Sequence, residues 1–296
     1  MVSTGAKLRR LMAGKGLVLA PGAYDALSAK IIAGLGFESV YLTGYGASAS
    51  RLGEPDVGLL SMAEMVSHAR GIVSAVPGVP VIADADKGYG NALNVGRTVR
   101  EYEAAGVAAI QLEDQVLPKR CGHMEGKRVV PVEEMVGKLR AAVDARMDPD
   151  LVIIARTDAR AVEGFAAAIA RSQAYRAAGA DVIFLEAPVS REELAEVGRV
   201  VQAPLLANLI EHGKTPLVGP AELAAMGYRI AIYPLSALYA AAKAVRDVLT
   251  ELKTEGTTER VIDRMIAFEE FNHLVGLPEY QALESRYVPR GQREQL

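Results

Sequence analysis

Residues 104–114 read AAGVAAIQLED, and the same pattern returns as AAGADVIFLEA at 177–187 and as AMGYRIAIYP at 225–234. Each copy ends an alanine-rich helical pattern, places a glycine, and continues into a short apolar run. Glycine readily takes the positive φ that closes many helices, and a short apolar run is typical of a buried strand. The repeated stretch therefore predicts a helix-to-strand turn, and Gly36 marks a fourth copy of it.

Extending this unit in both directions gives eight strands that alternate with amphipathic helices. Such alternation predicts parallel strands joined by right-handed crossovers, and eight repeats favour an α/β fold, the (β/α)8 barrel of the TIM type. An open doubly wound sheet is the weaker alternative, because PGAYD at 21–25 replaces the glycine-rich phosphate motif expected after its first strand. The strands are predicted at 17–20, 39–42, 80–83, 108–112, 151–155, 181–185, 204–207 and 229–233. The helices are predicted at 6–13, 23–35, 61–76, 93–105, 132–145, 164–178, 191–201, 220–226 and 236–253.

Two further helices are predicted at 257–273 and 278–287, beyond what eight units need. We therefore expect residues 1–296 to form a single (β/α)8 barrel domain, with 254–296 as a C-terminal helical extension. Surplus helices of this kind either cover their own barrel or pack on a neighbouring subunit. The residues alone favour neither arrangement.

The composition limits the partners and the compartment. A length of 296 residues suits a barrel of about 250 residues with an extension. The net charge of -3, from 33 basic and 36 acidic residues, indicates no nucleic-acid or membrane partner. The single cysteine excludes an intramolecular disulfide and favours the cytoplasm. No apolar run approaches the roughly 18 residues that span a bilayer.

Polar residues gather where the predicted strands end, which is the face at which barrel enzymes build their sites. They include Thr43 and Gly44 in the loop after the second strand, Asp84 and Asp86 after the third, Glu113 after the fourth, Arg156 and Asp158 after the fifth, Glu186 after the sixth and Asn208 after the seventh. Because side chains alternate along an extended chain, Asp84 and Asp86 can point the same way. Asp84, Asp86 and Glu113 are therefore candidate ligands of Mg2+, with Mn2+ as the second choice. The competing interpretation is that these carboxylates cap helices or pair with arginines.

Lys119-Arg120-Cys121-Gly122-His123 is the densest concentration of reactive groups in the chain. Most free cysteines are simply small buried hydrophobes. Here two cations and a histidine surround the thiol in a glycine-containing loop, a setting that lowers a thiol pKa and suits proton transfer. Covalent catalysis is less favoured, because no pattern of the cysteine-protease kind is present.

These motifs resemble the isocitrate lyase and phosphoenolpyruvate mutase superfamily. The resemblance runs from about residue 21 into the C-terminal helices, and its most specific pieces are DADKGYGN at 84–91, LEDQVLPKRCGH at 112–123, IIARTDA at 153–159 and IYPLSAL at 232–238. It implies a Mg2+-dependent barrel that acts on a small carboxylate and assembles as a homotetramer. In that family a terminal helix packs on a partner subunit, which favours exchange of the C-terminal helices between subunits.

The resemblance also implies a role for each matching residue. Asp84 is the direct metal ligand, with Asp86 and Glu113 holding the ion largely through water. Cys121 is the proton donor, Tyr41 is the candidate for accepting the substrate hydroxyl proton, and Glu186 positions the others. The substrate site is lined by Thr43, Gly44, Tyr45, Asp56, Lys119, Arg120, Gly122, His123, Arg156 and Asn208, of which Lys119, Arg120 and His123 supply positive charge.

The implied reaction is a retro-aldol cleavage of a 2-hydroxy acid, which yields pyruvate and a carboxylate-stabilised carbanion that Cys121 protonates. The loop sequence is similar to those of 2,3-dimethylmalate lyases, methylisocitrate lyases and the carboxyphosphonoenolpyruvate phosphonomutase-like group. Tyr45 should narrow the pocket and disfavour a tricarboxylate, so a substituted malate is the first expectation and 2-methylisocitrate the second. The alternatives are phosphorus–carbon bond chemistry, hydrolysis of oxaloacetate, and a non-catalytic barrel that serves as a binding subunit.

Overall fold

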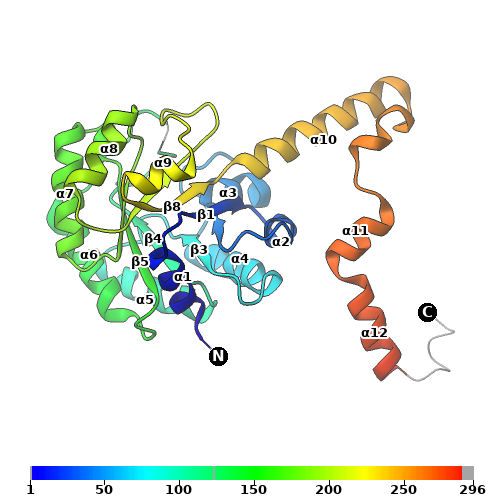
Figure 1. The fold of residues 1–296 in the computed structure, drawn as a ribbon, viewed down its shortest axis with the longest axis horizontal. Helices are drawn as coiled ribbons and strands as arrows, with labels where there is room; N and C mark the ends of the chain where they lie inside the picture. The colour runs from blue at the N-terminus through cyan, green and yellow to red at the C-terminus, as the bar shows by residue number, and fades with distance from the viewer. Residues whose placement is uncertain (1, 123, 289–296) are drawn as a thin grey trace. The chain divides into compact units, whose positions relative to one another are not determined.

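The computed structural model describes residues 2–122 and 124–288, and its strands form the predicted closed barrel. Eight parallel strands pair in chain order, and β8 closes the ring against β1 (Figure 1). The strands are β1 (Val18–Ala23), β2 (Val40–Leu42), β3 (Val81–Asp84), β4 (Ala109–Glu113), β5 (Val152–Thr157), β6 (Val182–Leu185), β7 (Leu205–Asn208) and β8 (Tyr228–Tyr233). The predicted α/β barrel is confirmed.

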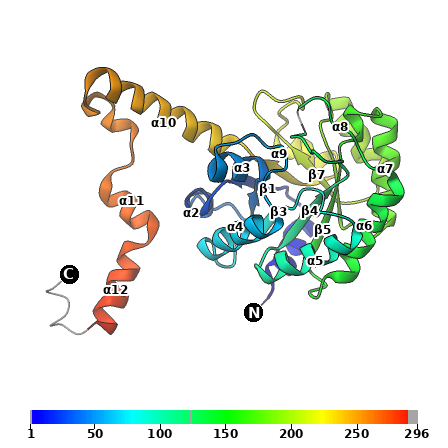
Figure 2. The same cartoon turned by 180° about the vertical axis from the view of Figure 1, so that it is seen from behind.

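Helices surround the strands on the outside of the barrel (Figures 1 and 2). They are α2 (Ala26–Gly34), α3 (Gly44–Leu52), α4 (Met62–Ala75), α5 (Ala92–Ala104), α6 (Val132–Ala145), α7 (Phe165–Ala177), α8 (Arg191–Val200) and α9 (Pro220–Ala225), with the short 3-10 helix η1 (Ala159–Ala161) after β5. The four glycines that were predicted to join helix to strand, Gly36, Gly106, Gly179 and Gly227, have φ values of 87°, 89°, 104° and 94°. The turn predicted by the repeated stretch is therefore confirmed.

The barrel has two apolar layers. Inside the ring, side chains such as Ile82, Ile154 and Phe184 pack together, and α1 (Thr4–Ala13) covers the end where the strands begin by burying Leu8 and Met12 against them. A larger layer lies between the strands and the outer helices. Burial of this apolar surface is the main force that holds helices and strands together.

One α-helix of the barrel was not predicted. The stretch after β2, expected as a loop, is the helix α3, whose N-cap is Thr43. The Thr43 hydroxyl accepts a hydrogen bond from the amide of Gly46 at 3.1 Å, a contact that satisfies one of the free amides of a helix start. Gly44 and Gly46 have poor helix propensity, so local sequence alone does not indicate a helix here.

The loop that follows β4 comprises residues 115–129, and the two residues that flank it lie side by side. Val130 N donates to Asp114 O at 2.8 Å, and Arg171 Nη1 donates to Val130 O at 2.8 Å. The buried Asp114 carboxylate accepts from Thr157 Oγ1 at 2.7 Å and from Tyr175 OH at 2.8 Å. We call Asp114, Val130 and Arg171 the neck of the loop, because together they hold its two ends side by side.

The chain divides into two compact units, Met1–Leu238 and Tyr239–Leu296. The division falls within α10 (Ser236–Glu255), earlier than the predicted start of the extension at 254. The second unit continues with the 3-10 helix η2 (Glu259–Arg264), α11 (Phe268–Val275) and α12 (Leu277–Tyr287). Neither α11 nor α12 buries a residue, and Phe268 and Tyr280 are 86% and 70% exposed. Within the described residues, none of the helices has the length and apolar character needed to cross a membrane.

Candidate active site

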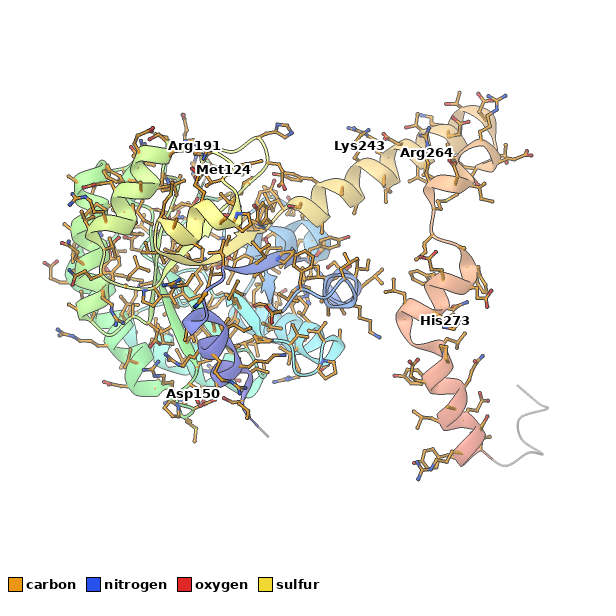
Figure 3. The ribbon with its side chains drawn as sticks, viewed as in Figure 1. Met124, Asp150, Arg191, Lys243, Arg264 and His273 are labelled. Carbon is orange, nitrogen blue, oxygen red and sulfur yellow. The ribbon has the colours of Figure 1, made fainter. Side chains whose placement is uncertain are left out.

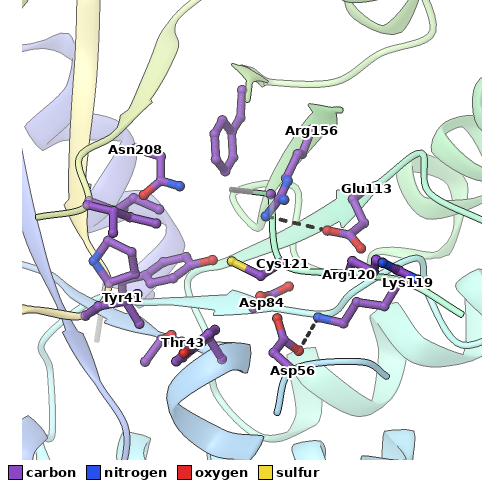
Figure 4. Close-up of a pocket in the computed structure, with 17 residues that line it drawn as sticks. Tyr41, Thr43, Asp56, Asp84, Glu113, Lys119, Arg120, Cys121, Arg156 and Asn208 are labelled. Atoms are coloured by element: carbon purple, nitrogen blue, oxygen red, sulfur yellow. Dashed lines mark ion pairs between the residues drawn. The ribbon is translucent and has the colours of Figure 1, made fainter. Parts of the chain in front are cut away.

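A pocket lies at the end of the barrel where the strands finish (Figure 4). Figure 3 distinguishes the two ends: Met124, in the loop after β4, lies at one end, and Asp150, just before β5, lies at the other. The predicted site residues that line the pocket are Tyr41, Thr43, Tyr45, Asp56, Asp84, Glu113, Lys119, Arg120, Cys121, Gly122, Arg156 and Asn208. The sequence did not single out the apolar residues that complete the lining, which are Phe184, Ile210, Ile232, Pro234 and Leu235.

Three other predicted residues lie just behind this lining. Gly44 is in close contact with Asp84, Asp86 pairs with Lys119, and Glu186 contacts Arg156 and Asn208. His123 lies outside the described residues. The structure therefore brings together every described residue that was predicted for the site, while their individual roles remain predictions.

Arg156 is a buried cation held among carboxylates. Its Nε and Nη2 donate to the two oxygens of Asp158 at 3.0 and 3.1 Å, and its Nη1 lies 3.5 Å from Glu113 Oε2. The guanidinium also lies 5.2 Å from the ring centre of Phe184. Burial alone would lower the pKa of Arg156, but the carboxylates, led by Asp158, outweigh it and raise the pKa. Nε and Nη2 both donate to Asp158, whereas Nη1 has only the longer contact with Glu113, so Nη1 is best placed to bind an anionic ligand.

Asn208, at the end of β7, is oriented by Glu186. The Asn208 amide nitrogen donates to both Glu186 oxygens at 3.2 Å. The amide oxygen of Asn208 is buried and has no hydrogen-bond partner among the described residues. A buried acceptor without a partner costs free energy, so this oxygen marks a place where a ligand donor would be stabilised.

Asp84, at the end of β3, is one of the buried carboxylates of the pocket. Its Oδ1 accepts from the Asp86 amide at 3.0 Å and from Gln111 Nε2 at 3.4 Å, while its backbone oxygen accepts from Tyr102 OH at 3.2 Å. Burial, followed by the charge of Asp86, raises the pKa of Asp84 to about 6. Buried carboxylates whose pKa is raised in this way are stabilised by a nearby cation.

Tyr41 is connected to the Asp84 carboxylate through the side chain of Gln111. The Tyr41 hydroxyl donates to Gln111 Oε1 at 3.0 Å, and Gln111 in turn contacts Asp84. Burial, followed by the charge of Asp84, raises the pKa of Tyr41 well above its usual value. In this structure the phenol donates to Gln111, and the role of proton acceptor that the resemblance implied for Tyr41 stays a prediction.

The expected alternation of Asp84 and Asp86 along an extended strand is wrong. β3 ends at Asp84, and Asp86 has a φ of 47°, so the chain has already turned. The Asp86 carboxylate lies 2.7 Å from Lys119 Nζ. The same Nζ lies 2.5 Å from Asp56 (Figure 4). Burial would lower the pKa of Lys119, but the carboxylates, led by Asp86, raise it. Lys119 is therefore a buried cation within the acidic half of the pocket.

The loop after β4 places Cys121 and Gly122 over the strand ends. Figure 4 shows Cys121 pointing into the pocket toward Tyr41. Gly122 packs so closely that an added Cβ would lie 2.5 Å from both Arg156 Nη2 and Glu186 Cδ. Arg120 is exposed and donates to the backbone oxygen of Glu125 at 3.0 Å. Because Asp56 and Asp86 neutralise Lys119, the positive charge expected beside the thiol is only partly available to it.

The acidic side of the pocket fits a hydrated divalent cation. In the part of the chain that the structure describes, no three acidic, histidine or cysteine side chains are arranged to contact one ion together. Mg2+ usually keeps several waters and takes one or two protein carboxylates, so Asp84 with water-mediated contacts to Asp86 and Glu113 would meet its needs. Glu113 Oε1 is buried without a hydrogen-bond partner among the described residues, so it could accept a hydrogen bond from a water on such a cation.

Sequence reasoning missed several residues that support the site. Asp158, expected only as a polar strand-end residue, lies just after β5 and holds Arg156; its spacing of two residues from Arg156 was the signal for this. Gln111 lies two residues before Glu113, and Gln115 directly follows Asp114, but neither carries a charge to attract notice. Lys127 gives no local signal, because its contacts depend on how the loop folds.

Comparison with known proteins places this site in a family. The family model described as phosphoenolpyruvate phosphomutase matches residues 8–253. The 2,3-dimethylmalate lyase of Eubacterium barkeri is 56% identical over 287 residues, covering 97% of this chain and 99% of that protein. A crystal structure of 2,3-dimethylmalate lyase has a TM-score of 0.92 at 41% identity, covering 97% and 96% of the two chains. The structure of phosphonopyruvate hydrolase with oxalate and Mg2+ has a TM-score of 0.88 at 34% identity, covering 97% and 100%. The chain therefore belongs to the phosphoenolpyruvate mutase and isocitrate lyase superfamily, as its KRCGH motif and strand-end residues predicted.

Proposed function

We propose that this enzyme is a Mg2+-dependent carbon–carbon lyase that cleaves an alkyl-substituted malate, of the 2,3-dimethylmalate type, to pyruvate and a carboxylate. The observation that carries the proposal is that Cys121 shares one pocket with Asp84 and Glu113 on one side and with Arg156 and Asn208 on the other. This arrangement offers a cation site, an anion site and a proton donor to the same small molecule. The names and structures of the most similar relatives support the same reaction class.

The metal would be held by Asp84, with Asp86 and Glu113 contacting its waters. When bound, a divalent cation of this kind lowers the pKa of a substrate hydroxyl and neutralises an adjacent carboxylate. The relative that was solved with Mg2+ and oxalate supports this assignment. The pair formed by Lys119 and Asp86 would then fix one carboxylate of the cation site in place.

The residues of the chain divide the remaining work. Arg156 Nη1 is free enough to bind a substrate carboxylate, and Asn208 Oδ1 can accept from a substrate hydroxyl. The substrate hydroxyl gives its proton to solvent, its oxygen forms the carbonyl of pyruvate with C2, and the bond between C2 and C3 breaks with its electron pair remaining on C3 beside the second carboxylate. Cys121 then transfers its thiol proton to C3, and a proton from solvent restores the thiol. Tyr41 would position Gln111 and, through it, Asp84.

The apolar part of the lining argues for an alkyl substituent on the substrate. Phe184, Ile210, Ile232 and Leu235 lie in the same pocket as the polar groups, and they would bury methyl groups of the substrate. Tyr45 lines this pocket as well. A third carboxylate would meet these apolar groups without a hydrogen-bond partner, so 2-methylisocitrate is the less favoured substrate.

A coupled assay tests the proposal. The purified enzyme with Mg2+ would be incubated with a panel of alkylmalates and with 2-methylisocitrate, and pyruvate would be followed by NADH oxidation through lactate dehydrogenase. We expect pyruvate from at least one alkylmalate and none after chelation of the metal. Failure to release pyruvate from every member of the panel would reject the lyase. Oxalate from oxaloacetate, or a changed phosphorus NMR signal from carboxyphosphonoenolpyruvate, would instead identify one of the alternative reactions.

The assembly and the compartment also remain proposals. The C-terminal unit exposes a large apolar surface, which is typical of a protein–protein interface. We therefore propose that the chain forms a homotetramer in which these helices pack on a partner subunit. The cytoplasmic location inferred from the single cysteine stays a prediction.

A further inference from the structure

We infer that Gln115 and Lys127 are positioning residues that clamp the backbone on both sides of Cys121, and that Lys127 connects this clamp to Arg156 through Asp158. The inference deepens the proposed function and rests on it for the role of Cys121 as proton donor. The clamp itself is carried by contacts within the loop.

The first half of the clamp is the buried side chain of Gln115. This residue directly follows Asp114 of the neck. Its Oε1 accepts from the Arg120 amide at 2.9 Å, and its Nε2 donates to the Arg120 carbonyl at 2.8 Å. One amide side chain thus satisfies both backbone groups of the residue that precedes Cys121. Two hydrogen bonds to one residue fix its orientation as well as its position.

The second half is Lys127, whose side chain is 1% exposed although it lies in a loop. Its Nζ donates to the carbonyl of Gly122, the residue that follows Cys121, and to Asp158 Oδ1 at 3.0 Å. A buried ammonium without such partners would be strongly destabilised, so its burial indicates that these contacts hold it in place. Arg156 and Lys127 together lower the pKa of Asp158 to about 2, against the effect of burial, so Asp158 stays charged between them.

These contacts join the loop that carries Cys121 to the anion-binding residue Arg156. The Asp158 carboxylate accepts hydrogen bonds from Arg156 Nε and Nη2 and also from Lys127 Nζ. Gly122 lies directly against the Arg156 guanidinium, with no room for a Cβ. The position of the thiol and the orientation of the anion-binding arginine are therefore set by one connected group of buried charges. A proton donor loses much of its effect when it moves by about 1 Å.

The experiment uses the single cysteine as its own reporter. Alkylation of Cys121 by iodoacetamide, followed by mass spectrometry of the intact protein, measures how accessible the thiol is without any need for catalysis. We expect Lys127→Met and Gln115→Leu to raise the alkylation rate by about 10-fold or more, because the loop loses one anchor beside the thiol. Arg128→Met is the matched control, since it removes an exposed cation one position away and should leave the rate within about 2-fold. Unchanged rates in both anchor variants would overturn the clamp.

Activity measurements then test the link to catalysis. On the substrate identified by the pyruvate assay, Lys127→Met should lower kcat by about 10-fold to 100-fold, and Lys127→Arg, which can still bridge Gly122 and Asp158, should recover most of it. Gln115→Glu keeps one of its two contacts and serves if Gln115→Leu does not fold. If the parent enzyme releases no pyruvate but the alkylation rates change as expected, the proposed function fails and the clamp stands. If activity falls while neither alkylation rate changes, the clamp is rejected and the lyase stands.

Discussion

Cys121 is the only cysteine in the chain, so its chemistry can be altered at one atom. Cys121→Ser keeps the shape of the side chain but replaces the thiol with a much weaker acid. We expect turnover to fall by about 100-fold or more, because a positioned proton donor contributes about that much. The melting temperature and its rise on addition of Mg2+ should stay close to those of the parent. A fully active serine variant would remove Cys121 from the mechanism.

Gly44 makes a second prediction at the scale of one residue. An added Cβ would lie 2.7 Å from Asp84 Oδ2, so Gly44→Ala must displace either the start of α3 or the carboxylate. We expect weaker Mg2+ binding, measured by calorimetry, and at least 10-fold lower activity. Gly137→Ala is the matched control, because Gly137 lies within α6 and nothing is within 4 Å of its added Cβ. That substitution should preserve both properties and slightly stabilise the helix.

At the scale of elements, α3 depends on its cap. Thr43→Val removes the hydroxyl that accepts from the Gly46 amide while keeping a similar volume. The expected loss of stability is about 1 kcal/mol, measured by chemical denaturation. The same change should raise KM, because the first turn of α3 carries Tyr45 into the pocket. Equal stability of the parent and the variant would show that the cap is not needed.

The elements also show what the sequence could and could not predict. The strands and their glycine-marked turns were predictable, because burial on both faces of a parallel strand leaves a continuous apolar run. The strand-end residues followed, since parallel strands bring their carboxyl ends to one face. Asp86 was misjudged because its positive φ interrupts the strand periodicity. Lys127 was missed because a lysine in a glycine-containing loop usually faces solvent, and only the folded loop reveals its buried partners.

At the scale of the whole molecule, the metal should stabilise the fold. A ligand that binds the folded state alone raises its stability in proportion to the logarithm of its concentration over Kd. We expect Mg2+ to raise the melting temperature of the parent, and Asp84→Asn to lose most of that rise. Scanning fluorimetry with Mg2+, with Ca2+ and with chelator would measure it. A rise of the same size in Asp84→Asn would place the metal elsewhere.

The exposed surface of the C-terminal unit gives the last prediction. Phe268 is 86% exposed there, and Leu93, which is 85% exposed on α5, provides a matched control in the barrel unit. If the C-terminal helices pack on another subunit, Phe268→Asp should lower the mass measured by light scattering, because a buried carboxylate is strongly disfavoured. Leu93→Asp should leave the mass unchanged. The same mass for the parent and the Phe268 variant would contradict the proposed packing.

The neck formed by Asp114, Val130 and Arg171 holds the first and last residues of the loop side by side, outside the loop itself. The loop between these fixed ends is therefore a segment that protein engineering could exchange as a unit. A segment of another length could be grafted between Asp114 and Val130 without rebuilding any strand, because the entropy of closing a loop grows only slowly with its length. Such a graft would keep Asp84, at the end of β3, while it replaced the thiol by a different acid or by none, provided that the new loop also supplies a cation in place of Lys119 for Asp86. One barrel could then be redirected toward a new reaction by the exchange of a single loop.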